Sequence, residues 1–176
     1  MKKFIALCTA AVLCLSLLSA CSGGKDENPS NAPGKAIDLS AFAQTVQENH
    51  EFYSLNRVDP EDADLGEMMA QMLDNYYPGL SDLDLNQMEI YMPMISFSGG
   101  ELALVRAKSA EDAAKVKEIF QSRIDSKSVE GPNNYPEEVE MWQRSAKVAD
   151  YGNYVLLVNH DDSEAIVSEF NAAFES

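Results

Sequence analysis

Cysteine is scarce in this chain. The 176 residues include only three, Cys8, Cys14 and Cys21, and none occurs after position 21. Residues 22–176 therefore offer no thiol for a disulfide, for nucleophilic catalysis or for a thiolate metal site. A domain formed there depends on its apolar core for stability, and about 140 residues are enough for one such core.

Basic residues are also few, because 13 Lys and Arg stand against 29 Asp and Glu, which gives a formal net charge of −16. Binding to phosphate groups needs clustered Lys and Arg, so we expect no nucleic-acid partner. Anionic lipid headgroups should also repel the domain. The acidity would suit cations or a basic partner, although a soluble acidic surface is the simpler explanation.

Catalytic signatures are missing as well. The chain has two histidines, His50 and His160, and neither lies in an HExxH, HxH or nucleophile-elbow pattern. No GxSxG, Walker or GxGxxG sequence occurs. Paired acids such as Glu137-Glu138 are too common at this composition to identify an acid–base pair. The sequence therefore provides no catalytic residue and no cofactor.

The one long apolar run, residues 4–18, is too short for a stable membrane span. It follows Lys2 and Lys3 and leads into Leu18-Ser19-Ala20-Cys21, the pattern of a lipobox. We interpret residues 1–20 as a lipoprotein signal peptide and Cys21 as the lipidation site, whose thiol takes a diacylglycerol before cleavage. An ordinary secretory signal cleaved nearby is the alternative. Loss of the two lysines would change the charge from −16 to −18.

Residues 21–36 are the predicted lipidated cysteine and flexible tether, because Gly, Ser, Pro, Asn and charges fill the segment without an apolar period. A coil of this length spans on the order of 20 Å. The acyl anchor would hold residues 37–176, a single α+β domain, on the outer face of the cytoplasmic membrane.

Helix and strand patterns alternate within the domain. Asp38 is a predicted N-cap, Ser109 with Asp112 forms a capping-box pattern, and Pro136 suits a first helical turn. The predicted helices cover 39–46, 65–73, 110–124, 136–144 and 163–174, the last capped by Asp161 or Asp162; the predicted strands cover 88–97, 101–107, 147–151 and 154–158.

Glycine-containing turns place the four strands in two hairpins, one around Gly99-Gly100 and one around Gly152-Asn153. At an offset of 53 residues the first hairpin falls on the second, and Leu104-Val105 falls on Leu157-Val158. This match is short, so a ββα duplication and two unrelated units are both open. We predict an α+β fold, a four-stranded antiparallel sheet from two hairpins with helices packed over one face.

Asp82, Asp84 and Asn86 carry oxygen ligands of the kind that Ca²⁺ prefers. An EF-hand loop starting at Asp82 would need Gly and Glu where the chain has Gln87 and Pro93. We therefore favour a strand edge with one buried face and keep Ca²⁺ as the alternative for these three residues.

Methionine is abundant and clusters on predicted faces. Soft thioethers can bind Cu(I), but Met is also an ordinary filler of irregular cores, and we favour the core. The faces carry Met88, Met92 and Met94 on a strand, and Met68, Met69 and Met72 on a helix.

Trp142 is the only tryptophan, and Val139 and Ala146 share its helix face. We favour packing in the core for this face. The alternative is a partner surface with Tyr135 and Trp142 as anchors, because these aromatic residues often carry interface energy.

Several short motifs carry a family resemblance: Ile37-Asp38-Leu39, Glu101-Leu102-Ala103-Leu104-Val105, Tyr135-Pro136 and Gly152-Asn153-Tyr154-Val155-Leu156-Leu157-Val158. In these motifs the chain resembles the bacterial lipoproteins grouped as domain-of-unknown-function family 4358, found in Gram-positive anaerobes. The resemblance implies an anchored extracytoplasmic domain and offers no catalytic residue.

These observations favour a membrane-anchored, non-enzymatic interaction or binding module at the bacterial cell envelope. Its expected partners are the membrane, through the acyl anchor, and an envelope protein. A cell-envelope hydrolase that uses carboxylates and a small-molecule or metal-binding lipoprotein are the alternatives.

Overall fold

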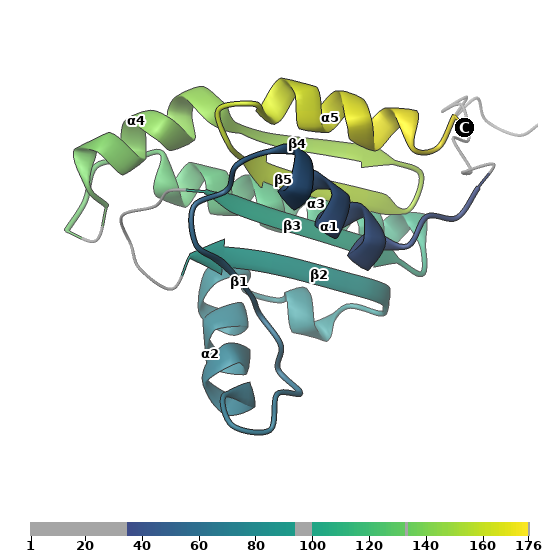
Figure 1. Cartoon of the computed structure of the whole chain (residues 1–176). Coiled ribbons are helices and arrows are strands. Elements are labelled where there is room, and N and C mark those ends of the chain that lie inside the picture. Colours follow the sequence, from purple (N-terminus) through teal and green to yellow (C-terminus); the bar gives the residue numbers. More distant parts are fainter. Residues whose placement is uncertain (1–34, 94–99, 133, 176) are drawn as a thin grey trace, which may run out of the picture.

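The computed structural model describes residues 35–93, 100–132 and 134–175. Within them an antiparallel sheet lies between two layers of helices (Figure 1). The predicted signal peptide, Cys21 and nearly all of the tether lie outside the described residues. No helix within the described ranges combines the length and apolar character needed to cross a membrane.

The sheet has five strands in the order β1-β2-β3-β5-β4, and every neighbouring pair is antiparallel. The α+β class and the antiparallel pairing are therefore confirmed, but the predicted count of four strands is wrong. The strand that was missed, β1, has only three residues, too few to show a period of two. The strands are β1 (Leu55–Arg57), β2 (Leu85–Pro93), β3 (Glu101–Ala107), β4 (Ala146–Tyr151) and β5 (Tyr154–Asn159).

The β2 strand begins three residues before the predicted start at Met88. The last predicted strand residues, 94–97, and Gly99 of the first predicted turn lie outside the described residues. In the second hairpin, Gly152 has the positive φ of 57° that a tight turn requires.

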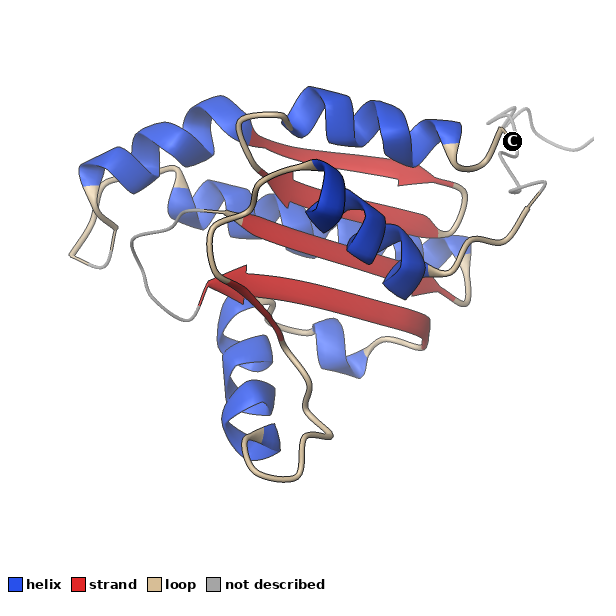
Figure 2. Ribbon diagram, in the orientation of Figure 1, coloured by secondary structure: helices blue, strands red, loops and turns tan. Residues whose placement is uncertain are grey.

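Five α-helices and one short 3₁₀-helix complete the described fold (Figure 2). Asp38 caps the first helix by accepting hydrogen bonds from the backbone N–H groups of Ser40 and Ala41. Ser109 caps the third helix by accepting from the N–H of Asp112 at 3.0 Å. The helices are α1 (Leu39–Asn49), α2 (Gly66–Tyr76), η1 (Leu80–Asp82), α3 (Ala110–Lys127), α4 (Pro136–Ser145) and α5 (Ser163–Ala172).

Helices cover both faces of the sheet, which corrects the prediction of one covered face. Alternate residues of β3 point to opposite sides: Leu102 and Leu104 pack with α1 and α5, whereas Ala103 and Val105 pack with α2 and α3. A strand buried on both faces has a continuous apolar run rather than an alternation. The Leu-Ala-Leu-Val run of β3 is such a signal.

The two hairpins lie side by side, but the helices that follow them do not occupy equivalent places. α3 packs on one face of the sheet and α5 on the other (Figure 1). At the offset of 53 residues, Leu104 corresponds to Leu157, and these two side chains belong to opposite cores. The arrangement therefore lacks the two-fold symmetry that related ββα units would give this antiparallel pair of hairpins.

Candidate functional site

A buried ion pair joins the start of β3 to the C-terminal half of α3. Arg123 donates from Nε to Glu101 Oε1 at 3.0 Å and from Nη2 to Glu101 Oε2 at 2.7 Å. The two residues are 9% and 2% exposed. Removing two charges from water is costly, and such a bidentate geometry is the arrangement that best offsets the cost.

The sequence places this arginine on the core side of α3 by helical spacing. Val116, Phe120 and Arg123 follow one another at intervals of four and three, and all three are buried. The predicted stripe continued instead through Ile124, which is only half-buried. A charge at a core position of a helix is therefore the sequence signal for this site, and it was missed.

Tyr77 completes the buried network by donating a hydrogen bond from its hydroxyl to Glu101 Oε1. Burial, together with the negative charge of Glu101, raises the pKa of Tyr77 well above its ordinary value, so the phenol stays protonated as a donor. Burial alone would lower the pKa of Arg123, but the charge and hydrogen bonds of Glu101 outweigh it and raise that pKa.

Aromatic rings surround the guanidinium of Arg123. Its Cζ lies 4.6 Å from the ring centroid of Tyr76, 5.3 Å from that of Trp142 and 5.9 Å from that of Tyr77. A planar guanidinium is suited to such stacking, and cation–π contacts strengthen when they are desolvated. The positive charge of Arg123 is therefore stabilised both by the Glu101 carboxylate and by the neighbouring aromatic rings.

A second ion pair lies beside the first and joins α3 to α4. Lys127 Nζ is 2.6 Å from Glu138 Oε1, and both side chains are largely buried. The other oxygen of this carboxylate, Oε2, is buried without a hydrogen-bond partner among the described residues, and so is the indole Nε1 of Trp142. One orphan acceptor and one orphan donor thus remain in this region.

These side chains line two adjoining hollows. The larger, about 630 Å³, is bordered by residues from the end of α2, from α3 and from the loop before α4. The smaller, about 60 Å³, is bordered by Glu101, Glu138 and Trp142. Both hollows share Tyr76, Arg123 and Lys127, and we call the combined feature the Arg123 cleft.

The cleft offers hydrogen-bond donors, acceptors and ring faces within a small volume. Each of its two buried carboxylates, Glu101 and Glu138, contacts a cation, so their charges are already balanced. Balanced ion pairs suit the recognition of a polar, uncharged group better than the attraction of an ion.

The two aromatic residues considered as a partner surface do not form one exposed patch. Trp142 is 2% exposed and packs in the core, as the helical stripe predicts. Tyr135 is 50% exposed. They lie at different ends of the Arg123 cleft, Tyr135 in the larger hollow and Trp142 in the smaller.

The three residues considered for Ca²⁺ run from η1 to the start of β2. Asp84 contacts Lys108 at 2.6 Å, and the amide of Asn86 donates to the carbonyl of Ala107 at 3.2 Å. Asp82 is exposed in η1. Among the described residues, the His, Cys, Asp and Glu side chains that approach one another closely enough to share a metal ion are His50, His160 and Asp162.

Most of the methionines lie where the core interpretation places them. Met69 and Met92 are buried, and Met72 and Met88 pack against the same core. Met68 is 40% exposed, so the predicted three-methionine helix face is wrong in that member. Met94 lies outside the described residues.

A family model described as Domain of unknown function (DUF4358) matches residues 61–160, more than half of the chain. Comparison of the chain with curated proteins and with solved structures found no match. The matched segment contains all the residues of the Arg123 cleft named above, from Tyr76 to Trp142.

Proposed function

Since the chain belongs to the DUF4358 family, we propose that it is a lipid-anchored extracytoplasmic binding module whose ligand occupies the Arg123 cleft. Two independent parts of the chain support the proposal: the lipobox at residues 18–21 and the composition of the cleft.

The anchoring half of the proposal rests on Cys21, which follows a charged and then apolar leader. Mass spectrometry of the native mature N-terminus should find a diacylated cysteine at position 21. The Cys21→Ala variant should remain unprocessed. An unmodified terminus cut at another residue would contradict this half and leave the binding half standing.

The binding half rests on one observation: Trp142 and Glu138 line the same hollow, and the indole Nε1 and the carboxylate Oε2 are a buried donor and a buried acceptor that have no hydrogen-bond partner among the described residues. A hydroxyl group can accept from an indole N–H and donate to a carboxylate at the same time. Leaving such groups unpaired in the interior costs free energy, which a ligand hydroxyl would recover. The cleft therefore suits a neutral, hydroxyl-bearing ligand such as a saccharide.

The larger hollow supports the same ligand class. Tyr76 and Tyr135 are about half-exposed there and offer ring faces for packing against the apolar side of a sugar ring. The formal charge of −16 for the whole chain disfavours a polyanionic ligand. The carboxylate-based hydrolase has less support, because Glu101 and Glu138 both contact cations rather than each other.

Fluorescence of Trp142 tests the binding half directly, because it is the only tryptophan and lines the cleft. Titration of the full chain in detergent with N-acetylglucosamine oligomers and with maltose should give a saturable change in emission for at least one probe. Tyr135→Ala should weaken the response about tenfold or more. Tyr53→Ala, which removes another exposed tyrosine that does not line the cleft, should not. No saturable change, or an equal loss in both variants, would reject the cleft as the site.

A further inference from the structure

Three metal-binding side chains meet where the first helix of the domain approaches the last. His50 follows α1, His160 follows β5, and Asp162 is the N-cap residue of α5. One ligand atom from each lies within 4.8 Å of the other two. None of the three lines the Arg123 cleft.

The Nε2 atom of each histidine faces an acceptor outside this group. His160 Nε2 is 3.2 Å from the carbonyl oxygen of Glu51, which can only accept, so this nitrogen carries the proton. His50 Nε2 is 3.2 Å from Glu169 Oε1. Metal-binding histidines show this pattern, because an outer carbonyl or carboxylate fixes the tautomer and leaves the other nitrogen free to bind.

The Nδ1 atom of His50 lies 3.1 Å from Asp162 Oδ2. When Nε2 donates its proton to Glu169 and the imidazole is neutral, a lone pair on Nδ1 faces a lone pair on the carboxylate, and a metal ion bound by both atoms relieves this repulsion. Nitrogen and oxygen ligands at about 2.0–2.2 Å from a tetrahedral Zn²⁺ are separated from each other by about 3.3 Å. The spacing of these two atoms is therefore close to that of two ligands on one metal ion.

We propose that His50, His160 and Asp162 bind a divalent transition-metal ion of the Zn²⁺ type through two imidazole Nδ1 atoms and one carboxylate. Two nitrogens and one oxygen favour Zn²⁺ over Ca²⁺ or Mg²⁺, which prefer all-oxygen sites. Three protein ligands leave a fourth position for water or a ligand atom. Ion access is open from the Asp162 side, where the side chain is 60% exposed.

Metal binding replaces two contacts, the one between His50 Nδ1 and Asp162 Oδ2 and the hydrogen bond that His160 Nδ1 accepts. The Nδ1 of His160 accepts a hydrogen bond from the N–H of Asp162 at 3.0 Å, and the metal takes this lone pair instead. The backbone N–H lies at the exposed start of α5 and can turn to water. The competing arrangement has His50 doubly protonated and paired with Asp162 and Glu169, which ties α1 to α5 without a metal.

Calorimetry distinguishes the two arrangements. The full chain, purified in detergent and stripped with a chelator, is titrated with Zn²⁺ and separately with Ca²⁺. We expect one Zn²⁺ per chain, a higher Tm with Zn²⁺, and no comparable response to Ca²⁺. Loss of a ligand in Asp162→Asn or His160→Gln should lower the Zn²⁺ affinity by about 100-fold or more.

The matched control is Asp161→Asn, which changes the neighbouring acid that pairs with Arg144 at 2.8 Å. It should bind Zn²⁺ like the unaltered chain. Thermal unfolding without metal shows whether each variant is folded. If one of the two ligand variants does not fold, the other still tests the site. Absence of Zn²⁺ binding, or equal affinity in Asp161→Asn and both ligand variants, would overturn the site and leave the protonated His50 arrangement.

Discussion

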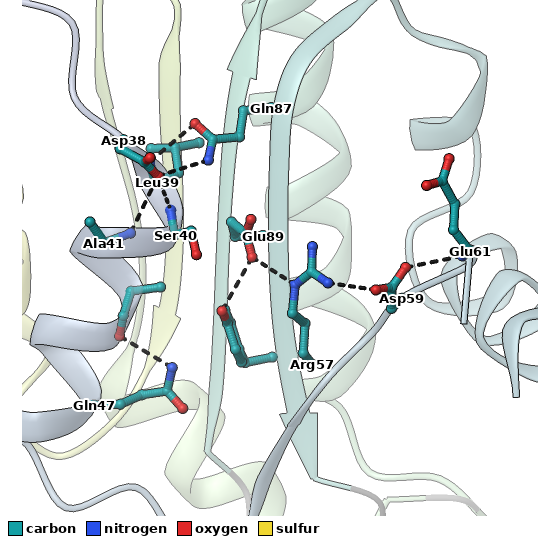
Figure 3. Close-up of polar contacts among 12 residues, drawn as sticks. Asp38, Leu39, Ser40, Ala41, Gln47, Arg57, Asp59, Glu61, Gln87 and Glu89 are labelled. Atoms are coloured by element: carbon teal, nitrogen blue, oxygen red, sulfur yellow. Dashed lines mark hydrogen bonds and ion pairs between the residues drawn. The ribbon is translucent and has the colours of Figure 1, made fainter. Parts of the chain in front are cut away.

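Gln87 on β2 holds the cap of α1 through Asp38 (Figure 3). Its Nε2 donates to Asp38 Oδ1 at 3.1 Å, while its Oε1 accepts from the N–H of Leu39 at 3.1 Å. The same Asp38 oxygen accepts from two backbone N–H groups of the first helical turn. One glutamine therefore fixes both the cap and the first residue of the helix to the sheet.

Stability at acid pH should reflect this arrangement. The hydrogen bond from Gln87, followed by those from Ala41 and Ser40, lowers the pKa of Asp38 below 3.8. Because the folded carboxylate binds a proton less readily than the unfolded one, its contribution is complete above pH 3.8 and is lost as the pH falls through the lower folded pKa. We expect Gln87→Ala to reduce this acid dependence, measured by urea unfolding from about pH 6 to pH 2.

The control for this experiment is Gln143→Ala. Its amide donates to the carbonyl of Ser128 at 2.7 Å rather than to a carboxylate. Its loss should leave the pH dependence unchanged, and an equal effect of the two variants would refute the role of Asp38.

Breaking the buried ion pair should be strongly destabilising. Arg123→Met removes the cation and leaves the Glu101 carboxylate buried, at a cost of about 3–5 kcal/mol. Removing both charges with Glu101→Gln and Arg123→Met together should cost less than the sum of the single changes. Arg144→Met, which breaks the exposed pair with Asp161, should cost less than about 1 kcal/mol. Similar losses for both arginines in urea unfolding would contradict this reading.

Gly66 at the start of α2 is closely covered by backbone. A Cβ atom at this position would lie 2.5 Å from the carbonyl oxygen of Pro60, so the turn before the helix would have to move. We expect Gly66→Ala to lower the free energy of unfolding by about 1–3 kcal/mol. Gly131→Ala, where a Cβ would meet nothing within 4 Å, should be neutral or slightly stabilising. Calorimetric melting would compare them, and equal Tm values would show that the turn adapts freely.

The emission of Trp142 should be blue-shifted and protected from quenchers in the folded chain. Its side chain is 2% exposed and packs with Tyr77 and Phe120 in one core. Unfolding in urea should shift the emission to the red. A red, freely quenched emission before denaturation would show that α4 does not dock as described.

Residues 35–176 should fold without the anchor. Apolar side chains on both faces of the sheet form two cores, and no disulfide is required. We expect a soluble monomer with one cooperative melting transition. Broad, non-cooperative melting would indicate that a partner completes the core.

Local rules predict the parts of the fold that depend on neighbouring residues. The bounds of β3 and the cap at Ser109 follow from strand composition and capping chemistry within a few residues. The continuous apolar run of β3 indicates a strand that is covered on both faces. The prediction of a single helical layer does not take this run into account. β1 is stabilised by its neighbour, where Arg57 contacts Glu89 at 2.9 Å, rather than by its own pattern (Figure 3).

The sites depend on contacts between residues that are distant along the chain. Arg123 and Glu101 are 22 positions apart, and His50 and Asp162 are 112 apart. Sequence spacing shows the charge on the core face of α3 but not the carboxylate that it meets. His160 and Asp162 are close in the sequence, but His50, the other proposed ligand, lies 112 positions before Asp162, so no local motif contains all three.

The order of strands in the sheet also determines when the domain can fold during synthesis. The neighbours of β3 are β2 and β5, and Glu101 of β3 pairs with Asn159 at the end of β5. The ribosome must therefore reach residue 159 before β3 can pair on both sides. The helix that covers one face of these strands, α5, follows later still. Pairing of β3 with β5 closes a long loop, and the entropic cost of closing this loop precedes the stabilising contacts between the two strands. A nascent chain that ends before residue 159 therefore has an open sheet edge and two incomplete cores, and cooperative folding starts only when the last part of the domain has been made.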